Sequence, residues 1–343
     1  FLLRQAAGRG EIALRDPERP LAACGYVLLG MGKLGARELN YSSDIDLIAL
    51  YDRSRIDYRG RRDVEDFCQR LTRDLLQLMS ERTAEGYVFR TDLRLRPDPG
   101  ATPLAISYGA AMSYYESMGQ NWERAAMIKA RAVAGDRPFG KAFLKELRPF
   151  VWRKSLDFLA IQDIHSIKRQ IHAHKGGGTI AIEGHNVKLG RGGIREIEFY
   201  VQTLQRVTGG RDLELRGRST VRMLSALATK GWISEADSTT MTEAYRYLRR
   251  VEHRLQMVAD EQVHTLPDEA GLPRIARMMR DAAFEANLRA MLERVHERFL
   301  SLGNGGLRAN PILAEATRAE KPIDDAVAAA FATAAEVWHE GRY

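Results

Sequence analysis

The chain has 343 residues, of which 45% are hydrophobic, and it carries a formal net charge of +7. That length can bury one large core or two smaller ones, so two domains are the natural expectation. The two cysteines, Cys24 and Cys68, supply neither a disulfide framework nor a metal-ligand spacing, which excludes a small disulfide-rich secreted protein and favours a reducing cytoplasm.

The positive charge is compatible with phosphate-bearing ligands or an acidic partner protein, and equally with a modest excess of surface arginines. No apolar run approaches the length of a membrane span, and the chain does not open with a signal-peptide pattern. Because it begins at Phe1 rather than at a methionine, we interpret it as a piece of a longer polypeptide.

Strand-like and helix-like patterns alternate over the first half of the chain. Apolar runs at residues 25–30 and 45–51 predict two buried strands, and apolar residues at helical spacing predict an amphipathic helix over 64–79. Alternation over residues 87–95 predicts a third strand. Its charged face, which we interpret as part of a site rather than a solvated edge, consists of Arg90, Asp92, Arg94 and Arg96.

Two carboxylates, Asp44 and Asp46, lie one residue apart at the start of the second predicted strand. Alternate side chains of an extended strand share a face, so both point into one site, and Asp92 on a neighbouring strand adds a third carboxylate. Three such groups can hold two Mg²⁺ ions for nucleotidyl transfer. An isolated Asp-x-Asp pair is more often a turn or a helix cap, so the strand context decides this interpretation.

A glycine-rich turn, Gly30-Met-Gly-Lys-Leu-Gly35, follows the first predicted strand. Glycines let backbone amides approach phosphate oxygens, and Lys33 adds a positive charge. The spacing is not that of a Walker A loop, and alone it indicates only a tight turn. Cations that could neutralise a phosphate are Arg94, Arg96, Arg124, Lys129 and Arg131, although Arg124 and Lys129 could equally be helical surface charges.

From about residue 144 onward the pattern is helical, with apolar stripes over 194–204 and 241–258 and a further helix over 289–302. Glycine loops at 176–178 and 190–193 interrupt it, and an alanine-rich helix is expected over 326–335. The second loop runs into a helix start and is a candidate anion pocket. Its cations are Lys188, Arg191 and Arg195, although Arg195 and Glu198, three apart, could form a plain surface ion pair. Glu196 and Glu198 cannot face one point on a helix, and the histidines are interpreted as structural.

Together these motifs resemble the glutamine synthetase adenylyltransferase/adenylyl-removing family, within the DNA polymerase β-like nucleotidyltransferase superfamily. The resemblance runs from residue 25 to residue 267, and the full set in this order is specific, whereas Asp-x-Asp alone is shared across the superfamily. One departure is Ala36, where the family often has a second glycine. The matching segments are residues 30–35, 37–47, 92–97, 122–124, 129–131 and 192–199.

The resemblance implies an α+β fold: a polymerase β-like nucleotidyltransferase domain with a small mixed sheet, followed by an all-α helical bundle domain. We expect an N-terminal helical or linker remnant over 1–24, the catalytic domain over 25–150 and the bundle over 151–310. Residues 311–343 would lead to a further part of the polypeptide.

Family members resemble two nucleotidyltransferase units in tandem: one adenylylates a tyrosine of glutamine synthetase with ATP, and the other removes the AMP by phosphorolysis, giving ADP. The loop over 186–199 is basic, whereas the corresponding stretch of the adenylylating unit resembles an acidic version. This chain therefore looks like the adenylyl-removing unit, a regulator of nitrogen assimilation. The resemblance gives Asp44, Asp46 and Asp92 the Mg²⁺ ions. Phosphate contacts are then expected from Gly30, Gly32, Lys33 and Ser43, and from the basic residues named above.

The expected partners are adenylylated glutamine synthetase, inorganic phosphate and ADP, with a PII-type signal protein in the full-length enzyme. The alternatives are the forward, ATP-dependent adenylylation, a nucleotidyltransferase acting on RNA or a small molecule, and a catalytically silent regulatory module. No stretch of interleaved aromatic and basic residues supports nucleic acid binding.

Overall fold

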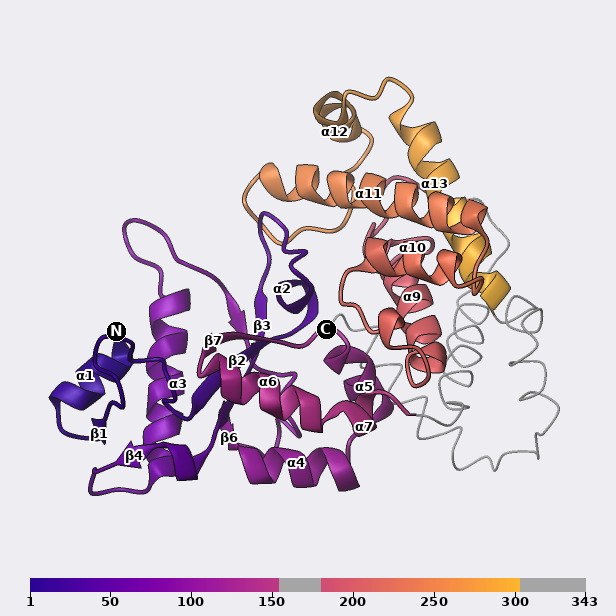
Figure 1. The fold of residues 1–343 in the computed structure, drawn as a ribbon. Coiled ribbons are helices and arrows are strands. Elements are labelled where there is room, and N and C mark those ends of the chain that lie inside the picture. The colour runs from indigo at the N-terminus through magenta and orange to yellow at the C-terminus, as the bar shows by residue number, and fades with distance from the viewer. Residues whose placement is uncertain (154–179, 303–343) are drawn as a thin grey trace. The chain divides into compact units, whose positions relative to one another are not determined.

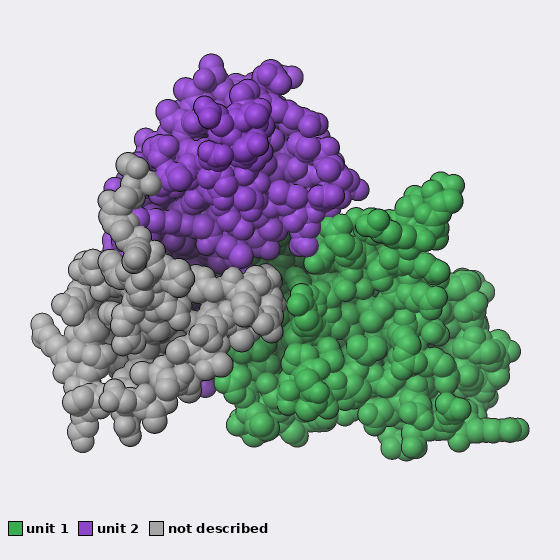
Figure 2. Space-filling view, turned by 180° about the vertical axis from the view of Figure 1, so that it is seen from behind, with its two compact units in different colours: residues 1–39, 43–152 green, residues 40–42, 153–343 purple. Residues whose placement is uncertain are grey.

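The computed structural model describes residues 1–153 and 180–302, and these form two compact units (Figures 1 and 2). Unit 1 consists of residues 1–39 and 43–152, and unit 2 contains residues 40–42 and the chain from 153 onward. Within the described residues, no helix combines the length and the hydropathy needed to cross a bilayer.

Unit 1 is built on a small mixed sheet with the strand order β5-β3-β2-β7, to which β6 adds by pairing with β3. Strand β2 runs antiparallel to β3 and β7, whereas β5 and β6 run parallel to β3. A separate two-stranded ribbon pairs β1 with β4. The strands are β1 (Ile12–Ala13), β2 (Tyr26–Gly30), β3 (Ile45–Tyr51), β4 (Asp57–Tyr58), β5 (Thr91–Asp92), β6 (Ala105–Ser107) and β7 (Arg131–Gly135).

Both faces of β2 are covered, which explains its uninterrupted apolar sequence. Tyr26 and Leu28 share a core cluster with Phe67 and Leu71 of helix α3, while the alternate residues face helix α6. A Cβ placed on Gly140 of α6 would lie 2.7 Å from Val27 Cγ2, so this glycine lets the helix approach the sheet closely. The helices of unit 1 are α1 (Leu2–Gly8), α2 (Gly32–Ala36), α3 (Val64–Ser80), α4 (Tyr108–Ser117), α5 (Asn121–Met127), α6 (Arg137–Glu146) and α7 (Arg148–Val151) (Figure 1).

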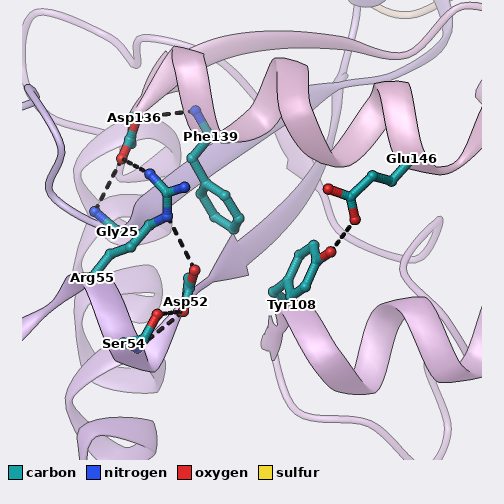
Figure 3. Close-up of polar contacts among 8 residues, drawn as sticks. All are labelled: Gly25, Asp52, Ser54, Arg55, Tyr108, Asp136, Phe139 and Glu146. Carbon is teal, nitrogen blue, oxygen red and sulfur yellow. Dashed lines mark hydrogen bonds and ion pairs between the residues drawn. The ribbon is translucent and has the colours of Figure 1, made fainter.

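Asp136 fastens the start of α6 to the start of β2 (Figure 3). Its carboxylate accepts hydrogen bonds from Phe139 N (3.1 Å) and Gly25 N (3.4 Å), and it lies 4.0 Å from an Arg55 nitrogen. Arg55 also pairs with Asp52 at 3.1 Å and lies over the Phe139 ring. Asp136 is buried, and these partners satisfy the hydrogen-bonding groups of its carboxylate.

At the other end of α6, the Tyr108 hydroxyl donates a hydrogen bond to Glu146 (Figure 3). The same tyrosine ring packs against Phe139 and Phe143, so it ties the first turn of α4 to two turns of α6. Residues 1–24, expected as a remnant of a neighbouring segment, lie within unit 1: Leu3 joins the α3 core cluster, and Glu11 pairs with Arg70 at 2.9 Å.

In its described part, unit 2 consists of helices and connecting loops, with an isolated bridge between Asn186 and Thr265. The stripe over 194–204 is buried as predicted, and so are the apolar residues of the 241–258 stripe up to Leu255, whereas Val258 follows the helix end and is exposed. The expected loop at 176–178 and helix at 326–335 lie outside the described residues. The helices are α9 (Ile194–Thr208), α10 (Thr220–Thr229), α11 (Glu235–Met257), α12 (Leu272–Met279) and α13 (Phe284–Ser301).

The predictions for β2, β3 and α3 are confirmed within one residue at each end. The strand predicted over 87–95 is wrong: only Thr91–Asp92 pairs with β3, and the chain then turns because Asp92 accepts a hydrogen bond from Arg94 N at 2.7 Å. The four charged residues of the expected strand face therefore do not line one face.

Candidate functional site

Two of the three predicted carboxylates lie side by side. In the parallel pairing of β3 and β5, Asp46 is the register partner of Asp92, and Ile45 is the partner of Thr91. Direct partners on neighbouring strands project from the same face of the sheet. Asp44 precedes Asp46 by two residues, and the backbone pairing reaches it because Ile45 N donates a hydrogen bond to Arg90 O (2.9 Å).

The glycine turn runs against this carboxylate pair. Strand β2 ends at Gly30, Met31 N donates to Asp46 O at 2.9 Å, and the five-residue helix α2 follows. Gly32 has φ +45°, and a Cβ placed on it would lie 2.9 Å from Asp46 Oδ2. Glycine at position 32 therefore allows both the left-handed backbone and the close approach to the carboxylate.

The far end of the turn is held by β7. A Cβ placed on Gly35 would lie 2.0 Å from Lys129 O, so no other residue fits this position. Arg131 donates from Nε to Gly35 O (3.1 Å) and from Nη2 to Leu34 O (2.8 Å). Desolvation, followed by the repulsion of Arg37 and Arg137, lowers the pKa of the Arg131 guanidinium. Arg131 was predicted as a phosphate ligand, and in this structure its guanidinium binds backbone carbonyls of the turn.

Each outer carboxylate has an arginine partner. Arg90 Nε lies 2.8 Å from Asp44 Oδ1. Arg94 donates to Asp92 through Nε (2.8 Å) and Nη2 (2.5 Å), and this hydrogen bonding raises the pKa of the Arg94 guanidinium. The positive charges of the two arginines reduce the repulsion between the neighbouring carboxylates.

Carboxylate oxygens are the ligands that Mg²⁺ prefers, so the donor set of Asp44, Asp46 and Asp92 fits a divalent cation chemically. Among residues 1–153 and 180–302, no group of three or more His, Cys, Asp or Glu side chains gathers closely enough to form a metal cluster. The oxygens of Asp44 and Asp92 are directed to Arg90 and Arg94 instead. The magnesium site therefore stays a prediction, and in this structure Arg90 and Arg94 pair with two of its three predicted ligands.

Two other predicted cations of unit 1, Arg124 and Lys129, are buried, and Arg96 is half-buried. Arg124 is fully buried and donates to Phe150 O (2.8 Å), and Lys129 is buried beside Glu38 at 3.6 Å. The alternative that these two are helical surface charges is wrong. Arg96 donates to the carbonyls of Leu93, Pro99 and Thr102, and desolvation lowers the pKa of its guanidinium.

The remaining candidates of unit 1 belong to the turn and its surroundings. Lys33 lies in α2 and Ser43 directly precedes Asp44, and both are half-buried. A Cβ on Gly30 would lie 2.7 Å from Val133 Cγ1, so this glycine is required by packing between strands.

The basic loop of unit 2 is ordered by its own residues. Asn186 Oδ1 accepts hydrogen bonds from the backbone N–H groups of Lys188 (3.0 Å) and Leu189 (2.8 Å). Arg195 lies 3.6 Å from Glu198, so the ion pair considered as an alternative is present, although Glu198 is buried. Lys188, Arg191 and Arg195 all lie in unit 2, whereas the carboxylates lie in unit 1.

Glu196, the neighbouring acid, turns to His296 Nδ1 at 3.2 Å, so the two glutamates have separate partners, as the helical spacing predicted.

Sequence reasoning missed two features of unit 1. Glu123 forms a capping box with Gln120 at the start of α5 and accepts a hydrogen bond from Tyr114 at 3.1 Å, and burial raises its pKa to about 7. The Gln-x-x-Glu spacing was available in the sequence as a capping signal. Arg90 was recognised only as a charged residue of a strand face, and its pairing with Asp44 depends on the fold.

Comparison with known proteins gives the family. A model described as glutamate-ammonia ligase adenylyltransferase matches residues 3–146, and one described as GlnD PII-uridylyltransferase matches residues 164–302. The chain is 59% identical over 306 residues to the bifunctional glutamine synthetase adenylyltransferase/adenylyl-removing enzyme of Mesorhizobium japonicum, covering 88% of this chain and 31% of that protein. The chain belongs to this family.

Relatives of the same description occur in Brucella melitensis, 60% identical over 81% of this chain and 28% of the relative, and in Rhizobium meliloti, 53% identical over 100% of this chain and 36% of the relative. The chain thus spans about a third of the length of the curated relatives that it matches. The family membership expected from the motifs is confirmed.

Proposed function

We propose that this chain carries a nucleotidyltransferase site that removes AMP from an adenylylated tyrosine of glutamine synthetase by phosphorolysis. An oxygen of inorganic phosphate forms a bond to the phosphorus of the tyrosine-linked AMP, and the bond from that phosphorus to the tyrosine oxygen breaks. The products are ADP and the tyrosine phenolate, which takes up a proton. The reaction would regulate nitrogen assimilation through the activity of the synthetase.

The observation that carries this proposal is the register of Asp46 with Asp92, with Gly32 of the glycine turn against Asp46. The arrangement unites carboxylates and a turn whose backbone approaches them closely. It supports the proposal of a site for the metal-assisted phosphoryl reaction that the motifs predicted. The relatives named above are adenylyltransferase/adenylyl-removing enzymes, which supports the same chemistry in this chain.

Asp44, Asp46 and Asp92 would hold the magnesium ions, because hard divalent cations prefer carboxylate oxygens. In this structure Arg90 pairs with Asp44, and Arg94 pairs with Asp92. When bound, Mg²⁺ would neutralise the charge of an anionic phosphate and an anionic diester that must approach each other. The chain's own residues bind and orient the phosphates: Gly30 and Gly32 through the backbone of the turn, and Lys33 and Ser43 through their side chains.

No general acid is required for the leaving group, because a tyrosine phenol has an ordinary pKa of about 10 and its phenolate is a tolerable leaving group. Arg94, released from Asp92, would face the reacting phosphates with its charge. The sequence candidates Lys188, Arg191 and Arg195, which lie in unit 2, stay a prediction of phosphate binding. The choice of AMP removal over AMP addition rests on the resemblance of this basic loop to that of the adenylyl-removing unit.

The match of residues 164–302 to a PII-uridylyltransferase model supports a PII-type signal protein as a regulatory partner of the full-length enzyme. Such a partner would act on unit 2, which contains the matched residues.

The test incubates the chain with adenylylated glutamine synthetase and Mg²⁺, with and without inorganic phosphate, and follows ADP formation and loss of AMP from the synthetase. We expect ADP only with phosphate, and its loss in Asp44→Asn and Asp46→Asn. Asp57→Asn is the matched control, because Asp57 is an exposed residue of the β1–β4 ribbon paired with Arg59.

The alternatives give different results in the same assay. AMP incorporation from ATP into the unmodified synthetase, without ADP formation from the adenylylated form, would assign the forward reaction. Turnover of another nucleotide acceptor alone would assign a different substrate. Absence of any metal-dependent turnover would leave a regulatory module that binds nucleotide or protein.

A further inference from the structure

We infer that Arg90 is a built-in counter-ion that holds Asp44 while no metal is bound and gives it up to a divalent cation, so that it sets the metal affinity of the site. The inference rests on the proposed function, because it takes Asp44 as a metal ligand. It goes further in assigning a positioning role to a residue outside the predicted ligand and phosphate-binding set.

The contact between the two residues is direct and displaceable. Arg90 Nε lies 2.8 Å from Asp44 Oδ1, and the side chains are 31% and 30% exposed, respectively. An ion pair with this exposure is screened by water and contributes modestly to stability, so a divalent cation can compete with it. The backbone of Arg90 is fixed at the same place, because its carbonyl accepts the hydrogen bond from Ile45 N.

Arg90 is also oriented from its other side. Its Nη1 donates to the Tyr87 hydroxyl at 2.5 Å, and its guanidinium carbon lies 5.6 Å from the centre of the Tyr87 ring. A guanidinium held both by a phenol oxygen and by an aromatic face loses fewer conformations when it binds a carboxylate. Tyr87 thus restricts the conformations of the Arg90 side chain that contacts Asp44.

Arg94 differs from Arg90 in how it is held. Its side chain is 59% exposed, and its bonds to Asp92 are formed within one turn of the chain. Arg90 instead joins the loop after α3 to the residue before β3 through its contact with Asp44, which is distant in sequence. Tyr87, three residues earlier in the chain, contacts the same guanidinium. Of these two cations, Arg90 is therefore the one whose removal should change the metal affinity of a preformed site.

A guanidinium and a divalent cation cannot share Asp44 without repulsion between like charges. Arg90 consequently opposes metal binding, and it protects the adjacent carboxylates from mutual repulsion when metal is absent. Once displaced, the guanidinium is available to a phosphate-bearing ligand. The counter-ion would make metal loading depend on the arrival of that ligand.

The experiment measures Mn²⁺ binding to the chain by the loss of the free-ion electron paramagnetic resonance signal, without substrate. We expect Arg90→Gln to tighten binding by about two- to fivefold, which corresponds to the loss of a partly exposed ion pair. Tyr87→Phe, which removes only the orienting hydroxyl, should tighten it less. Arg90→Lys keeps the charge and should remain close to the wild type.

Arg82→Gln is the matched control, because the Arg82 guanidinium lies over the same Tyr87 ring at 5.5 Å while Arg90 makes the carboxylate contact. Its Mn²⁺ affinity should equal that of the wild type. Circular dichroism of each variant establishes whether it is folded. If Arg90→Gln does not fold, Tyr87→Phe still tests the inference.

Two results would overturn the inference in distinguishable ways. If Asp44→Asn loses Mn²⁺ binding while Arg90→Gln and Tyr87→Phe bind no more tightly than the wild type, the metal site stands and the counter-ion role of Arg90 is wrong. If the wild type shows no saturable Mn²⁺ binding, or Asp44→Asn binds as well as the wild type, the proposed metal site fails and the inference fails with it.

Discussion

Asp46 and Asp92 are direct register partners in the parallel pairing of β3 with β5, although the whole of helix α3 lies between them in the sequence. Two carboxylates held side by side repel each other unless a cation is near. In this structure Arg94 supplies that cation to Asp92. The pairing places the predicted ligands together through backbone hydrogen bonds, so their proximity does not depend on a flexible loop.

Asp92→Asn should lower the phosphate-dependent formation of ADP by roughly 100-fold or more, because the amide removes one anionic ligand from the predicted metal site. The Kd for Mn²⁺ should rise in parallel. The unfolding temperature should change little, since the amide oxygen of asparagine can still accept the hydrogen bond from Arg94 N. A variant with full activity and unchanged metal affinity would show that Asp92 does not share the site with Asp44 and Asp46.

Glu123 should make the stability of unit 1 depend on pH. Burial raises its pKa to about 7 in the folded chain, from an ordinary value of 4.5, so the folded state binds the proton more tightly than the unfolded state. The contribution of Glu123 to the free energy of unfolding is largest below pH 4.5. It falls as the pH rises from 4.5 toward 7 and is constant at higher pH.

Between pH 5 and pH 7.5, the wild type should lose about 2 kcal/mol more unfolding free energy than Glu123→Gln, which keeps a neutral side chain throughout. Urea unfolding at both pH values measures this difference. Glu116→Gln, an exposed change in α4, is the control and should follow the wild type. Parallel pH profiles for Glu123→Gln and the wild type would contradict the prediction.

Asp136→Ala should destabilise unit 1 by about 2 kcal/mol, because it removes the cap of α6 and leaves the amide of Gly25 without its carboxylate partner. Denaturant unfolding followed by circular dichroism gives the value. Asp57→Ala removes an exposed ion pair with Arg59 and should leave the midpoint nearly unchanged. Equal effects of the two substitutions would mean that the buried network does not stabilise the fold.

Gly192→Ala should destabilise unit 2 more than Gly231→Ala does. The two glycines have nearly the same left-handed backbone, with φ +74° and +73°, so the conformational cost of alanine is matched. They differ in space: a Cβ on Gly192 would lie 2.0 Å from Leu292 O, whereas nothing lies within 4 Å of one on Gly231.

The excess destabilisation of Gly192→Ala over Gly231→Ala therefore measures the packing of the basic loop against α13. We expect the excess to exceed about 1 kcal/mol, as for other cases of forced overpacking. Thermal unfolding of both variants measures it, and indistinguishable midpoints would show that the loop is free to move away from the helix.

Apolar pattern alone was sufficient to predict β2, β3 and the long helices. β2 is an apolar run, and β3 is one apart from Asp46, because both strands are otherwise buried. Helices α9 and α11 have apolar stripes with the helical period. Strands β6 and β7 were not predicted, because β6 has three residues and β7 begins with an arginine that binds the neighbouring turn.

Local side-chain hydrogen bonding explains the main error. The alternation over 87–95 has the period of a strand, but Asp92 bonds the backbone of Arg94 and ends β5 after two residues. The candidate cations show a second limit. Arg124 and Lys129 look like surface residues in the sequence, and only the fold shows that both are buried.

The bonds of Arg131 to Gly35 and Leu34 have a consequence for the thermodynamics of binding. They hold the last turn of α2 to β7, and the absence of a side chain at Gly35 lets the two backbones touch. Any anion received by this turn meets amides that are already ordered. Association then loses little conformational entropy at the turn, and more of the interaction energy is retained as affinity.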